Sequence, residues 1–337
     1  FVGSTDVGEL RIGVLGAARI APSAVVEPAR DLPGVRIEAV AARDLSRART
    51  FAAAHGIPRV HGGYDELLAD PDIDAVYNPL PNGLHGRWTI AALEAGKHVL
   101  CEKPFTANRA EAEVVAAVVA SSGKVVMEAF HYRYHPLAAR VREIVDSGEL
   151  GELVHVEAWE CFPLPRFSDI RYRFDLAGGA LMDIGCYAVH MVRLAGRGEP
   201  EVLSARARLR SEQVDRAMRA ELRFAGGHTG RVGCSMWSTS LLRLSIRVTG
   251  SAGELRVLNP VLPQLYHRLT VRTADVRRVE RLGSRSTYSY QLEAFRDAVA
   301  GRPEANLTPP SDSIATMGVI DAVYEAAGMR PREPTPT

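Results

Sequence analysis

The sequence contains little cysteine, no long apolar run and almost no net charge. Its four cysteines are far apart and form no Cys-x-x-Cys pair: Cys101, Cys161, Cys186 and Cys234. This spacing argues against a disulfide scaffold or a metal site and favours reduced thiols. No stretch approaches the roughly 20 apolar residues that span a bilayer, and residues 1–10 lack the layout of a signal peptide. We therefore expect a cytoplasmic protein with neither a membrane nor a metal partner.

The charges are balanced, with 41 Lys and Arg against 40 Asp and Glu and a formal net charge of +1. Such a chain has no broad positive field to attract a polyanion, so nucleic acid is not an expected partner. The composition is 46% hydrophobic and 24% charged, which is typical of a globular protein. Because 337 residues exceed what one hydrophobic core usually fills, we expect two domains.

The first part of the chain alternates short β-branched runs with stretches of helical spacing. Strands are predicted at 11–15, 37–42, 75–78, 97–101 and 124–129, and helices at 46–55, 86–95 and 108–122. Each helix is followed by a glycine suited to a left-handed cap: Gly56, Gly96 and Gly123. This order is typical of a doubly wound parallel sheet, so we predict a dinucleotide-binding domain over residues 1–129.

The pattern changes after residue 130. Longer alternating runs predict the strands of an antiparallel sheet at 154–162, 202–209, 216–224, 230–237, 242–249 and 265–273. Helices are predicted at 135–147, 180–194, 290–300 and 313–327, and the segment 331–337 is expected to be disordered. We predict a second α+β domain over residues 130–337, whose last helix is a candidate for packing back on the first domain.

A candidate cofactor turn follows the first strand. The segment Gly16-Ala17-Ala18-Arg19-Ile20-Ala21 is a dinucleotide fingerprint with alanine at its second and third glycine positions. The motif needs a tight turn and then a backbone bare enough for pyrophosphate to approach a helix N-terminus. Glycine-alanine turns also serve ordinary packing, but the position in the first turn of a doubly wound pattern favours the cofactor. Cofactor contacts are predicted at Gly16, Ala18, Arg19 and Ile20.

The end of the second strand bears on the choice between NADP and NAD. A carboxylate there would bind the ribose hydroxyls of NAD, whereas arginine would pair with the 2′-phosphate of NADP. Our alignment puts Arg43 at this position, and Arg47 could reach the same phosphate from the helix start. NADP is therefore favoured over NAD. The alternative is that both arginines are solvated charges and Asp44 binds the ribose.

Two further segments follow strands of the first domain. The loop 79–85 contributes Pro81, Asn82 and His85 as candidate cofactor contacts, although His85 also fits a helix-start histidine with a backbone partner. The fourth strand ends in Glu102 and Lys103, and the carboxyl end of such a strand is where ligands bind. The alternative is an ion pair that caps the strand.

The segment 178–190 carries the second half of the predicted chemistry. Asp183 and Tyr187 are four residues apart, on one face of a helix, and glycines before them allow a close backbone approach. A tyrosine can exchange a proton with a hydroxyl if its pKa, roughly 10 when unperturbed, is lowered. Lys103 is the candidate for lowering it. We interpret His190 as a helix-surface or core residue.

With these motifs the chain resembles the glucose-fructose oxidoreductase and inositol dehydrogenase family, Gfo/Idh/MocA. The resemblance rests on ordered segments over nearly the whole chain: GAARIA, AARDLSRA, NPLPNGLH, ALEAGKHVLCEKP, EAFHYRYHP and GGALMDIGCYAVH. It implies a Rossmann domain, an open-faced antiparallel sheet, a site between them and a catalytic Lys103. Tyr187 stands where many members have histidine. A tyrosine at this position is similar to the dihydrodiol dehydrogenase-like branch, which uses NADP. Relatives also imply a homodimer or homotetramer.

The hypothesis is an NADP-dependent oxidoreductase that moves hydride between nicotinamide and a secondary alcohol or carbonyl. The substrate would be a sugar, keto sugar, polyol or cyclic diol, with Tyr187 as acid-base residue, Lys103 beside it, and Asp183 orienting the substrate or Lys103. The loop 163–177 is expected to line the cleft. Alternatives are a redox-neutral hydrolase or lyase that retains its nicotinamide, and a non-enzymatic NADP sensor. The sequence leaves open the substrate, the direction of reaction and the stereochemistry of hydride transfer.

Overall fold

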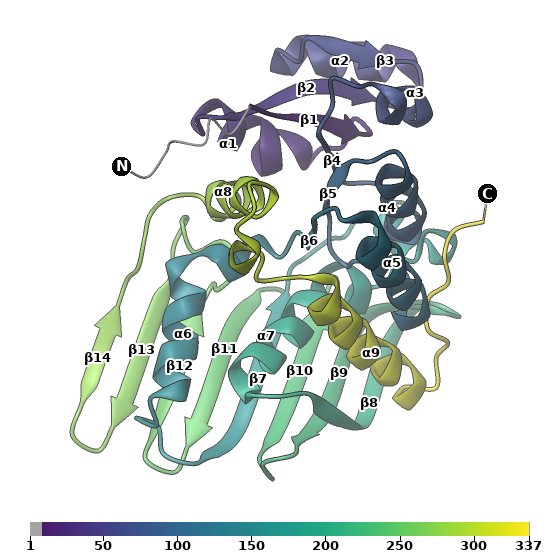
Figure 1. Ribbon diagram of the computed structural model, residues 1–337. Coiled ribbons are helices and arrows are strands. Elements are labelled where there is room, and N and C mark those ends of the chain that lie inside the picture. Colours follow the sequence, from purple (N-terminus) through teal and green to yellow (C-terminus); the bar gives the residue numbers. More distant parts are fainter. Residues whose placement is uncertain (1–8, 337) are drawn as a thin grey trace, which may run out of the picture.

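The computed structural model describes residues 9–336, which form two sheets and the helices that cover them (Figure 1). The first sheet has six parallel strands in the order β3-β2-β1-β4-β5-β6. This is the strand order of a dinucleotide-binding fold. The second sheet has eight strands in the order β14-β13-β12-β11-β7-β10-β9-β8. The predicted fold class, a doubly wound parallel sheet followed by a mostly antiparallel one, is confirmed.

The first sheet contains all five predicted strands and one that was missed. Its strands are β1 (Leu10–Leu15), β2 (Val35–Ala41), β3 (Arg59–His61), β4 (Ala75–Asn78), β5 (His98–Cys101) and β6 (Val126–Glu128). The missed strand, β3, is a three-residue edge strand of partly exposed side chains, too short to show alternation. The helices around the sheet are η1 (Pro22–Val26), α1 (Glu27–Arg30), α2 (Leu45–His55), α3 (Tyr64–Ala69), η2 (Asn82–Leu84), α4 (His85–Glu94) and α5 (Arg109–Ser122). Gly56, Gly96 and Gly123 have φ values of 70°, 75° and 65°, which confirms the three predicted caps.

The second sheet contains the six predicted strands and two that were missed, β12 and β14. Its strands are β7 (Leu153–Cys161), β8 (Pro200–Ser211), β9 (Val214–Phe224), β10 (Thr229–Ser235), β11 (Arg243–Gly250), β12 (Gly253–Leu258), β13 (Arg268–Thr273) and β14 (Arg277–Glu280). All neighbours are antiparallel except β7 and β10, which are parallel. The connection after β7 crosses to the far edge of the sheet, where β8 runs parallel to β7. The hairpins β8–β9 and β9–β10 each reverse the direction, so β10 is again parallel to β7.

Helices cover one face of the second sheet. Figure 1 shows α6 (Pro136–Asp146), α7 (Cys186–Gly196) and α9 (Pro310–Ala326) on this face. Elsewhere in this half of the chain there are short helical turns: η3 (His131–Tyr134), η4 (Ile170–Tyr172), η5 (Phe174–Leu176), η6 (Leu181–Gly185) and η7 (Pro303–Ala305). In β12 the side chains of Leu255 and Val257 are buried, whereas Arg256 and Leu258 on the opposite face are exposed. The sheet therefore has one packed and one open face.

One late helix joins the core of the first sheet. Helix α8 (Thr287–Val299) packs on η1 and α1, and its Leu292 and Phe295 belong to the apolar core that includes Ile12 of β1. Helix α9 packs on α5 as well as on α7 and β8. The boundary between the domains at residue 130 stays a prediction.

The expectation that the segment 331–337 is disordered is wrong for its described residues, 331–336. Arg332 is fully buried and donates hydrogen bonds to Gly178 O at 2.7 Å and to Asp215 Oδ1 at 3.0 Å. Thr335 donates from its backbone to Gly83 O at 2.8 Å and from its hydroxyl to Asp175 O at 2.7 Å. The composition of the segment gave no sign of this, because these four partners each lie more than 100 residues away in the chain.

Candidate active site

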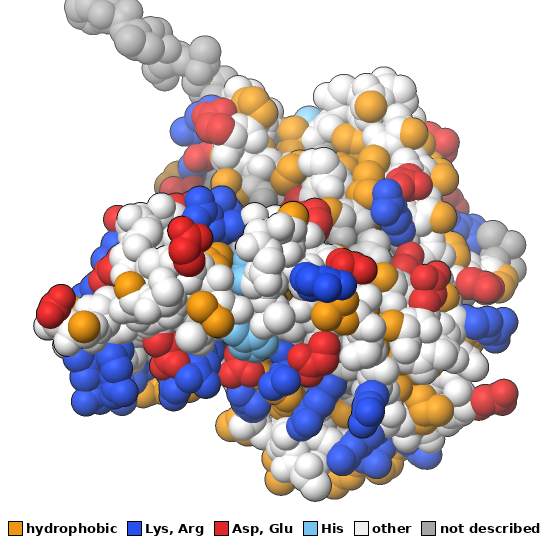
Figure 2. Space-filling view, turned by 90° about the horizontal axis from the view of Figure 1, so that it is seen from below, with side chains coloured by type: hydrophobic (Ala, Val, Ile, Leu, Met, Phe, Trp, Pro, Cys, Tyr) orange, Lys and Arg blue, Asp and Glu red, His pale blue; other side chains and the backbone are white. Residues whose placement is uncertain are grey.

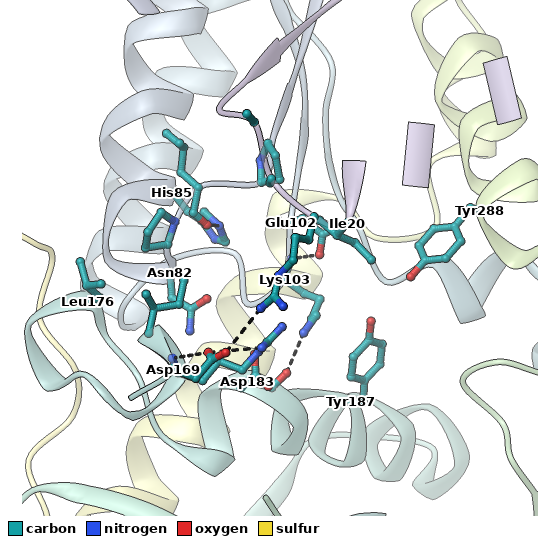
Figure 3. Close-up of a pocket in the computed structure, with 18 of the residues that line it drawn as sticks. Ile20, Asn82, His85, Glu102, Lys103, Asp169, Leu176, Asp183, Tyr187 and Tyr288 are labelled. Atoms are coloured by element: carbon teal, nitrogen blue, oxygen red, sulfur yellow. Dashed lines mark hydrogen bonds and ion pairs between the residues drawn. The ribbon is translucent and has the colours of Figure 1, made fainter. Parts of the chain in front are cut away.

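A cavity of about 380 Å³ lies at the carboxyl ends of β1 and β4. These strands are neighbours, and the chain leaves them toward opposite sides of the sheet, which is where doubly wound proteins bind ligands. The lining comes from both halves of the molecule: Ala17, Ala18, Arg19, Ile20, Arg47, Pro79, Leu80, Pro81, Asn82, His85, Glu102, Lys103, Asp169, Ile170, Arg171, Leu176, Asp183, Tyr187 and Tyr288. Figure 3 shows the main side chains of this cavity.

The fingerprint turn forms one wall. Gly16 has a φ of 93°, and a Cβ there would also lie 3.1 Å from Leu80 Cδ2, so the turn requires glycine. The backbone N–H groups of Arg19 and Ile20 have no backbone partner among the described residues and lie just before η1. Such a turn fits the pyrophosphate of a dinucleotide.

The end of β2 leaves two guanidinium groups unpaired. Arg43 and Arg47 are exposed, and neither forms an ion pair within residues 9–336. Asp44 instead caps α2, accepting hydrogen bonds from Ser46 N at 2.9 Å and Arg47 N at 3.3 Å. The hydrogen bond from the Ser46 hydroxyl and those from the two N–H groups lower the pKa of Asp44. The alternative in which Asp44 binds the ribose is thereby weakened, because its carboxylate already serves the helix.

The loop after β4 is held by backbone contacts. His85 is 1% exposed, and its Nδ1 and Nε2 atoms each lie 2.7 Å from a carbonyl oxygen, of Pro104 and Leu80. Burial lowers the pKa of His85 to about 4. This is the arrangement of a helix-start histidine with backbone partners, and it fixes the loop against the segment after β5. Asn82 donates to Ala177 O at 3.2 Å and so links the loop to the second half of the molecule.

Glu102 and Lys103 point in different directions. Glu102 accepts a hydrogen bond from the hydroxyl of Tyr77 at 2.8 Å, and burial raises the pKa of Glu102. Lys103 Nζ reaches across the cavity and donates to the backbone oxygen of Asp183 at 2.6 Å. Burial works against the charge of Lys103, but Cys186, Asp183 and Glu102 outweigh it and raise the pKa of the lysine overall. The two side chains do not form the strand-capping ion pair that was the alternative.

The acidic side chains opposite Lys103 form a second network. Asp183 Oδ1 accepts from Arg171 Nε at 2.9 Å, and Arg171 Nη1 lies 3.3 Å from Asp169 Oδ1. Asp169 also pairs with Arg19 of the fingerprint turn, Oδ2 to Nη2, at 3.5 Å. This Arg19–Asp169 pair links the fingerprint turn to the loop 163–177. Asp183 therefore holds Lys103 through its backbone, and its carboxylate is oriented by arginine.

Tyr187 lies on the floor of the cavity, 7% exposed. Lys103 Nζ is 4.9 Å from the centroid of its ring, and Figure 3 shows the hydroxyls of Tyr187 and Tyr288 pointing toward one another. Burial raises the pKa of Tyr187 well above its usual value, with Tyr288 and Glu102 adding to the shift. The expectation that Lys103 lowers this pKa is wrong for the structure, because the ammonium group contacts the ring and a backbone oxygen instead of the hydroxyl.

The helix that carries Asp183 and Tyr187 begins irregularly. The predicted single helix is a π-helical turn, η6, followed by α7, and such turns are frequent at functional sites. A Cβ on Gly178 would lie 2.6 Å from Arg171 O, and one on Gly179 would lie 2.2 Å from Asp215 Oδ1. The predicted close backbone approach is confirmed at Gly178, whereas the neighbours of Gly179 are side chains. His190 is a core residue, contacting the Tyr132 hydroxyl and bonding to Asp312 at 2.9 Å.

Most of the predicted site residues line this one cavity. Those that do are Ala18, Arg19, Ile20, Arg47, Pro81, Asn82, His85, Glu102, Lys103, Asp183 and Tyr187, whereas Gly16 and Arg43 lie outside the lining. The loop 163–177 contributes Asp169, Ile170, Arg171 and Leu176, as expected for the loop as a whole. Tyr288 was missed because α8 is far away in the chain and has no motif. His131, beneath Tyr187, lies in the EAFHYRYHP segment but had no assigned role.

Family models match both halves of the chain. Residues 10–130 match the model described as "Oxidoreductase family, NAD-binding Rossmann fold", and residues 138–256 match the "GFO/IDH/MocA C-terminal domain". The chain belongs to the Gfo/Idh/MocA family of oxidoreductases. The predicted resemblance and the predicted class of enzyme are confirmed.

Several Gfo/Idh/MocA proteins are similar over almost their whole length. D-xylose 1-dehydrogenase (NADP(+)) 2 of Haloferax volcanii is 39% identical, over 94% of this chain and 97% of the relative. A dTDP-3,4-didehydro-2,6-dideoxy-α-D-glucose 3-reductase of Actinomadura kijaniata is 33% identical, over 96% and 97%. A crystal structure of a 3-ketoreductase from A. kijaniata, in complex with NADP and TDP-benzene, has a TM-score of 0.87 at 32% identity and covers 96% of this chain and 98% of its own.

Other features of this Gfo/Idh/MocA chain bear on its surroundings. All four cysteines are buried and free. Among the described residues, no three or more His, Cys, Asp or Glu side chains are grouped as metal ligands. None of the helices that the structure describes combines the length and apolar character needed to cross a bilayer.

Proposed function

We propose that the chain is an NADP-dependent sugar oxidoreductase, which moves hydride between nicotinamide and a carbon that bears a hydroxyl or carbonyl oxygen. One observation carries the proposal: Lys103 from the first half and Tyr187 from the second meet in the cavity that also contains the fingerprint turn, with Nζ 4.9 Å from the ring centroid. A charged ammonium and a phenol beside a dinucleotide site can stabilise and protonate an alkoxide oxygen.

The choice of NADP rests on charge at the end of β2. Arg43 and Arg47 have no ion-pair partner among residues 9–336, and Asp44 is occupied as a helix cap, so this edge favours an additional phosphate over bare ribose hydroxyls. The Haloferax relative is named for NADP, and the A. kijaniata reductase was solved with it. Gly16, Ala18, Arg19 and Ile20 would hold the pyrophosphate, with Pro81, Asn82 and His85 along the opposite wall.

In the reductive reaction, Tyr187 is the proton donor, Lys103 supplies positive charge, and the Asp183 carbonyl positions Lys103. When bound, NADPH supplies the hydride. Tyr187 is protonated at neutral pH, since burial raises its pKa, and it donates its phenolic proton to the substrate oxygen. Lys103, charged at the same pH, stabilises negative charge on that oxygen, and the Asp183 carbonyl positions the ammonium group.

The substrate would be a sugar, keto sugar, polyol or cyclic diol. The side chains that line the cavity offer both hydrogen-bond donors and acceptors to neighbouring hydroxyl groups of such a substrate: Asn82, Arg171 and Asp183. Relatives are named as a xylose dehydrogenase, a reductase of a dTDP-linked keto sugar and, in Sus scrofa, a trans-1,2-dihydrobenzene-1,2-diol dehydrogenase. The substrates in these names share a carbon that bears a hydroxyl or carbonyl oxygen next to a carbon that bears another oxygen.

The test is a titration followed by a turnover assay. NADPH and NADH are titrated against the protein by fluorescence, and D-xylose, D-glucose, a sugar alcohol and a trans-dihydrodiol are then offered while absorbance at 340 nm is recorded. We expect tighter binding of NADPH and a change of absorbance with at least one sugar or diol. Tightly held cofactor with glycoside cleavage but no net absorbance change would instead identify a redox-neutral hydrolase or lyase. Binding without any turnover would favour an NADP sensor.

We also propose a cytoplasmic homodimer or homotetramer. Four buried, unpaired thiols support a reducing compartment. The open face of the second sheet supports assembly, because exposed apolar side chains such as Leu258 of β12 would be covered there. Figure 2, viewed from below, shows many basic side chains along its lower margin. Light scattering at several salt concentrations should show a mass of two or four chains, and a monomer under all conditions would reject the assembly.

A further inference from the structure

A buried histidine links Tyr187 to helix α8. His131 is 2% exposed, and its Nε2 atom lies 3.0 Å from Tyr187 Oη, while its Nδ1 atom lies 2.9 Å from Thr287 Oγ1. The reaction described above gives His131 no role. Yet this ring is the polar group that contacts the phenolic oxygen within the described part of the chain.

The surroundings of His131 keep its ring neutral. The titratable groups that face it are Lys103 from the segment after β5, Tyr187 from α7 and Tyr288 from α8, whose ring centroid is 4.2 Å away. Burial, together with the charge of Lys103, lowers the pKa of His131 to about 3. A neutral imidazole has one donor nitrogen and one acceptor nitrogen. The hydrogen bond at Nδ1 therefore decides what Nε2 can offer to Tyr187.

Thr287 permits either tautomer, because its hydroxyl can donate to Nδ1 or accept from it. Its hydroxyl can rotate and donate to Nδ1, which leaves the ring proton on Nε2. We propose that His131 is a positioning residue, donating from Nε2 to Tyr187 Oη so that the phenolic proton points into the cavity. The same hydrogen bond strengthens when the phenol becomes phenolate, since a donor favours the charged form. This inference rests on the proposed function, in which Tyr187 gives up its proton.

The proton balance is simple. In reduction, the O–H bond of Tyr187 breaks and an O–H bond forms on the substrate oxygen, while the electron pair for the new C–H bond comes from NADPH. His131 keeps its proton throughout and donates to the phenolate oxygen. Tyr187 is reprotonated by water that enters the open cleft after the product leaves.

The first test reads the tautomer and needs no turnover. Nitrogen-15 NMR of the histidine rings distinguishes an Nε2–H ring from an Nδ1–H ring, and the His131→Gln variant assigns the signal among the ten histidines. We expect a neutral Nε2–H ring from pH 5 to 8, whose shifts change in Tyr187→Phe. A neutral ring with the proton on Nδ1, or a protonated ring at pH 6, would overturn the proposal.

The second test is a double-mutant cycle in the turnover assay. We expect His131→Leu to lower kcat by roughly 10- to 100-fold, the worth of a hydrogen bond to a charged group, with little change in KM or in the NADPH dissociation constant. His131→Gln, which retains an N–H donor, should recover part of the loss. In the Tyr187→Phe background the same His131→Leu change should cost less than about twofold, because its effect passes through the phenol.

Two controls separate the possible failures. Equal losses in both backgrounds would show a merely structural role and overturn the proposal. If His131→Leu does not fold, as judged by circular dichroism, Thr287→Val replaces it. We then expect a mixed or Nδ1–H tautomer of His131 and a lower kcat. An unchanged tautomer would count against the inference. A wild-type protein that turns over no sugar or diol contradicts the proposed function, whereas the NMR result still decides the hydrogen bond.

Discussion

Lys103 approaches the face of the Tyr187 ring, with Nζ 4.9 Å from its centroid, and gives its hydrogen bond to the Asp183 carbonyl instead of the phenol. The two groups are therefore independent partners for a substrate: one offers positive charge and the other offers a proton. The pKa of Tyr187 stays high and that of Lys103 is raised, so both are protonated over the neutral range.

Removing the phenolic hydroxyl should abolish most of the activity. Tyr187→Phe keeps the ring that Lys103 contacts but removes the proton donor, so we expect kcat to fall by roughly 100-fold or more. The dissociation constant for NADPH, measured by fluorescence, should barely change. Tyr290→Phe, on α8 but outside the cavity lining, is the matched control and should retain the normal rate. Normal turnover in Tyr187→Phe would reject this assignment.

Cofactor preference should depend on the two exposed arginines at the end of β2. Arg43→Ala and Arg47→Ala each remove a charge-assisted contact to a 2′-phosphate, so NADP affinity should fall roughly 10- to 100-fold while NAD affinity stays nearly constant. Arg49→Ala, an exposed residue of the same helix, serves as the control. Calorimetric titrations with both cofactors give the ratio. A similar loss for NAD and NADP would remove the proposed role.

Stability should depend on Glu128 in a defined pH range. Burial raises the pKa of Glu128 to about 8, and its oxygens bond to Phe105 N at 2.9 Å and the Ser313 hydroxyl at 2.6 Å. Between its unfolded pKa, roughly 4.3, and the folded value the folded chain holds one more proton, so stability from this group falls as pH rises, by at most about 1.4 kcal/mol per unit.

The Glu128→Gln variant tests this directly, because an amide can form both hydrogen bonds without titrating. Urea unfolding at pH 5 and pH 8 should show that the variant gains stability relative to wild type as pH rises. If the difference in free energy of unfolding between the variant and the wild type is the same at pH 5 and pH 8, the raised pKa of Glu128 is contradicted.

The buried ion pair of the C-terminal segment should contribute strongly to folding. Arg332→Ala leaves the fully buried Asp215 without its partner, and we expect the free energy of unfolding to fall by about 3–5 kcal/mol. Arg330→Ala removes an exposed arginine two residues earlier and should change it by less than about 0.5 kcal/mol. Urea denaturation measures both, and equal stabilities for the two variants would show that the burial of Arg332 is unimportant.

Much of the fold could be predicted because local signals agreed with the tertiary structure. Gly56, Gly96 and Gly123 marked helix ends, and the apolar strands of the first sheet lie where their periodicity placed them. Short edge strands such as β3 and β14 were missed, since three or four residues cannot show alternation. The ordered end of the chain was missed because its composition resembles a linker, while its order comes from distant partners of Arg332.

The candidate site was predictable where residues follow strands or helix starts. Lys103 and Tyr187 were found in this way, and both line the cavity. The orientation of Lys103 could not be inferred, since it depends on how a carbonyl in η6 faces the end of β5. Tyr288 and His131 were also beyond reach, because the packing of α8 against η3 places them and no local pattern describes it.

The return of α8 to the first sheet sets a condition on biosynthesis. Leu292, Phe295 and Ala298 complete an apolar core whose other buried members precede residue 130. A ribosome that has made only the first half has therefore produced a sheet with a bare apolar surface, which waits for more than 150 further residues before it is covered. Nascent chains arrested before α8 should thus engage holdase chaperones, and release should coincide with the emergence of this helix from the exit tunnel.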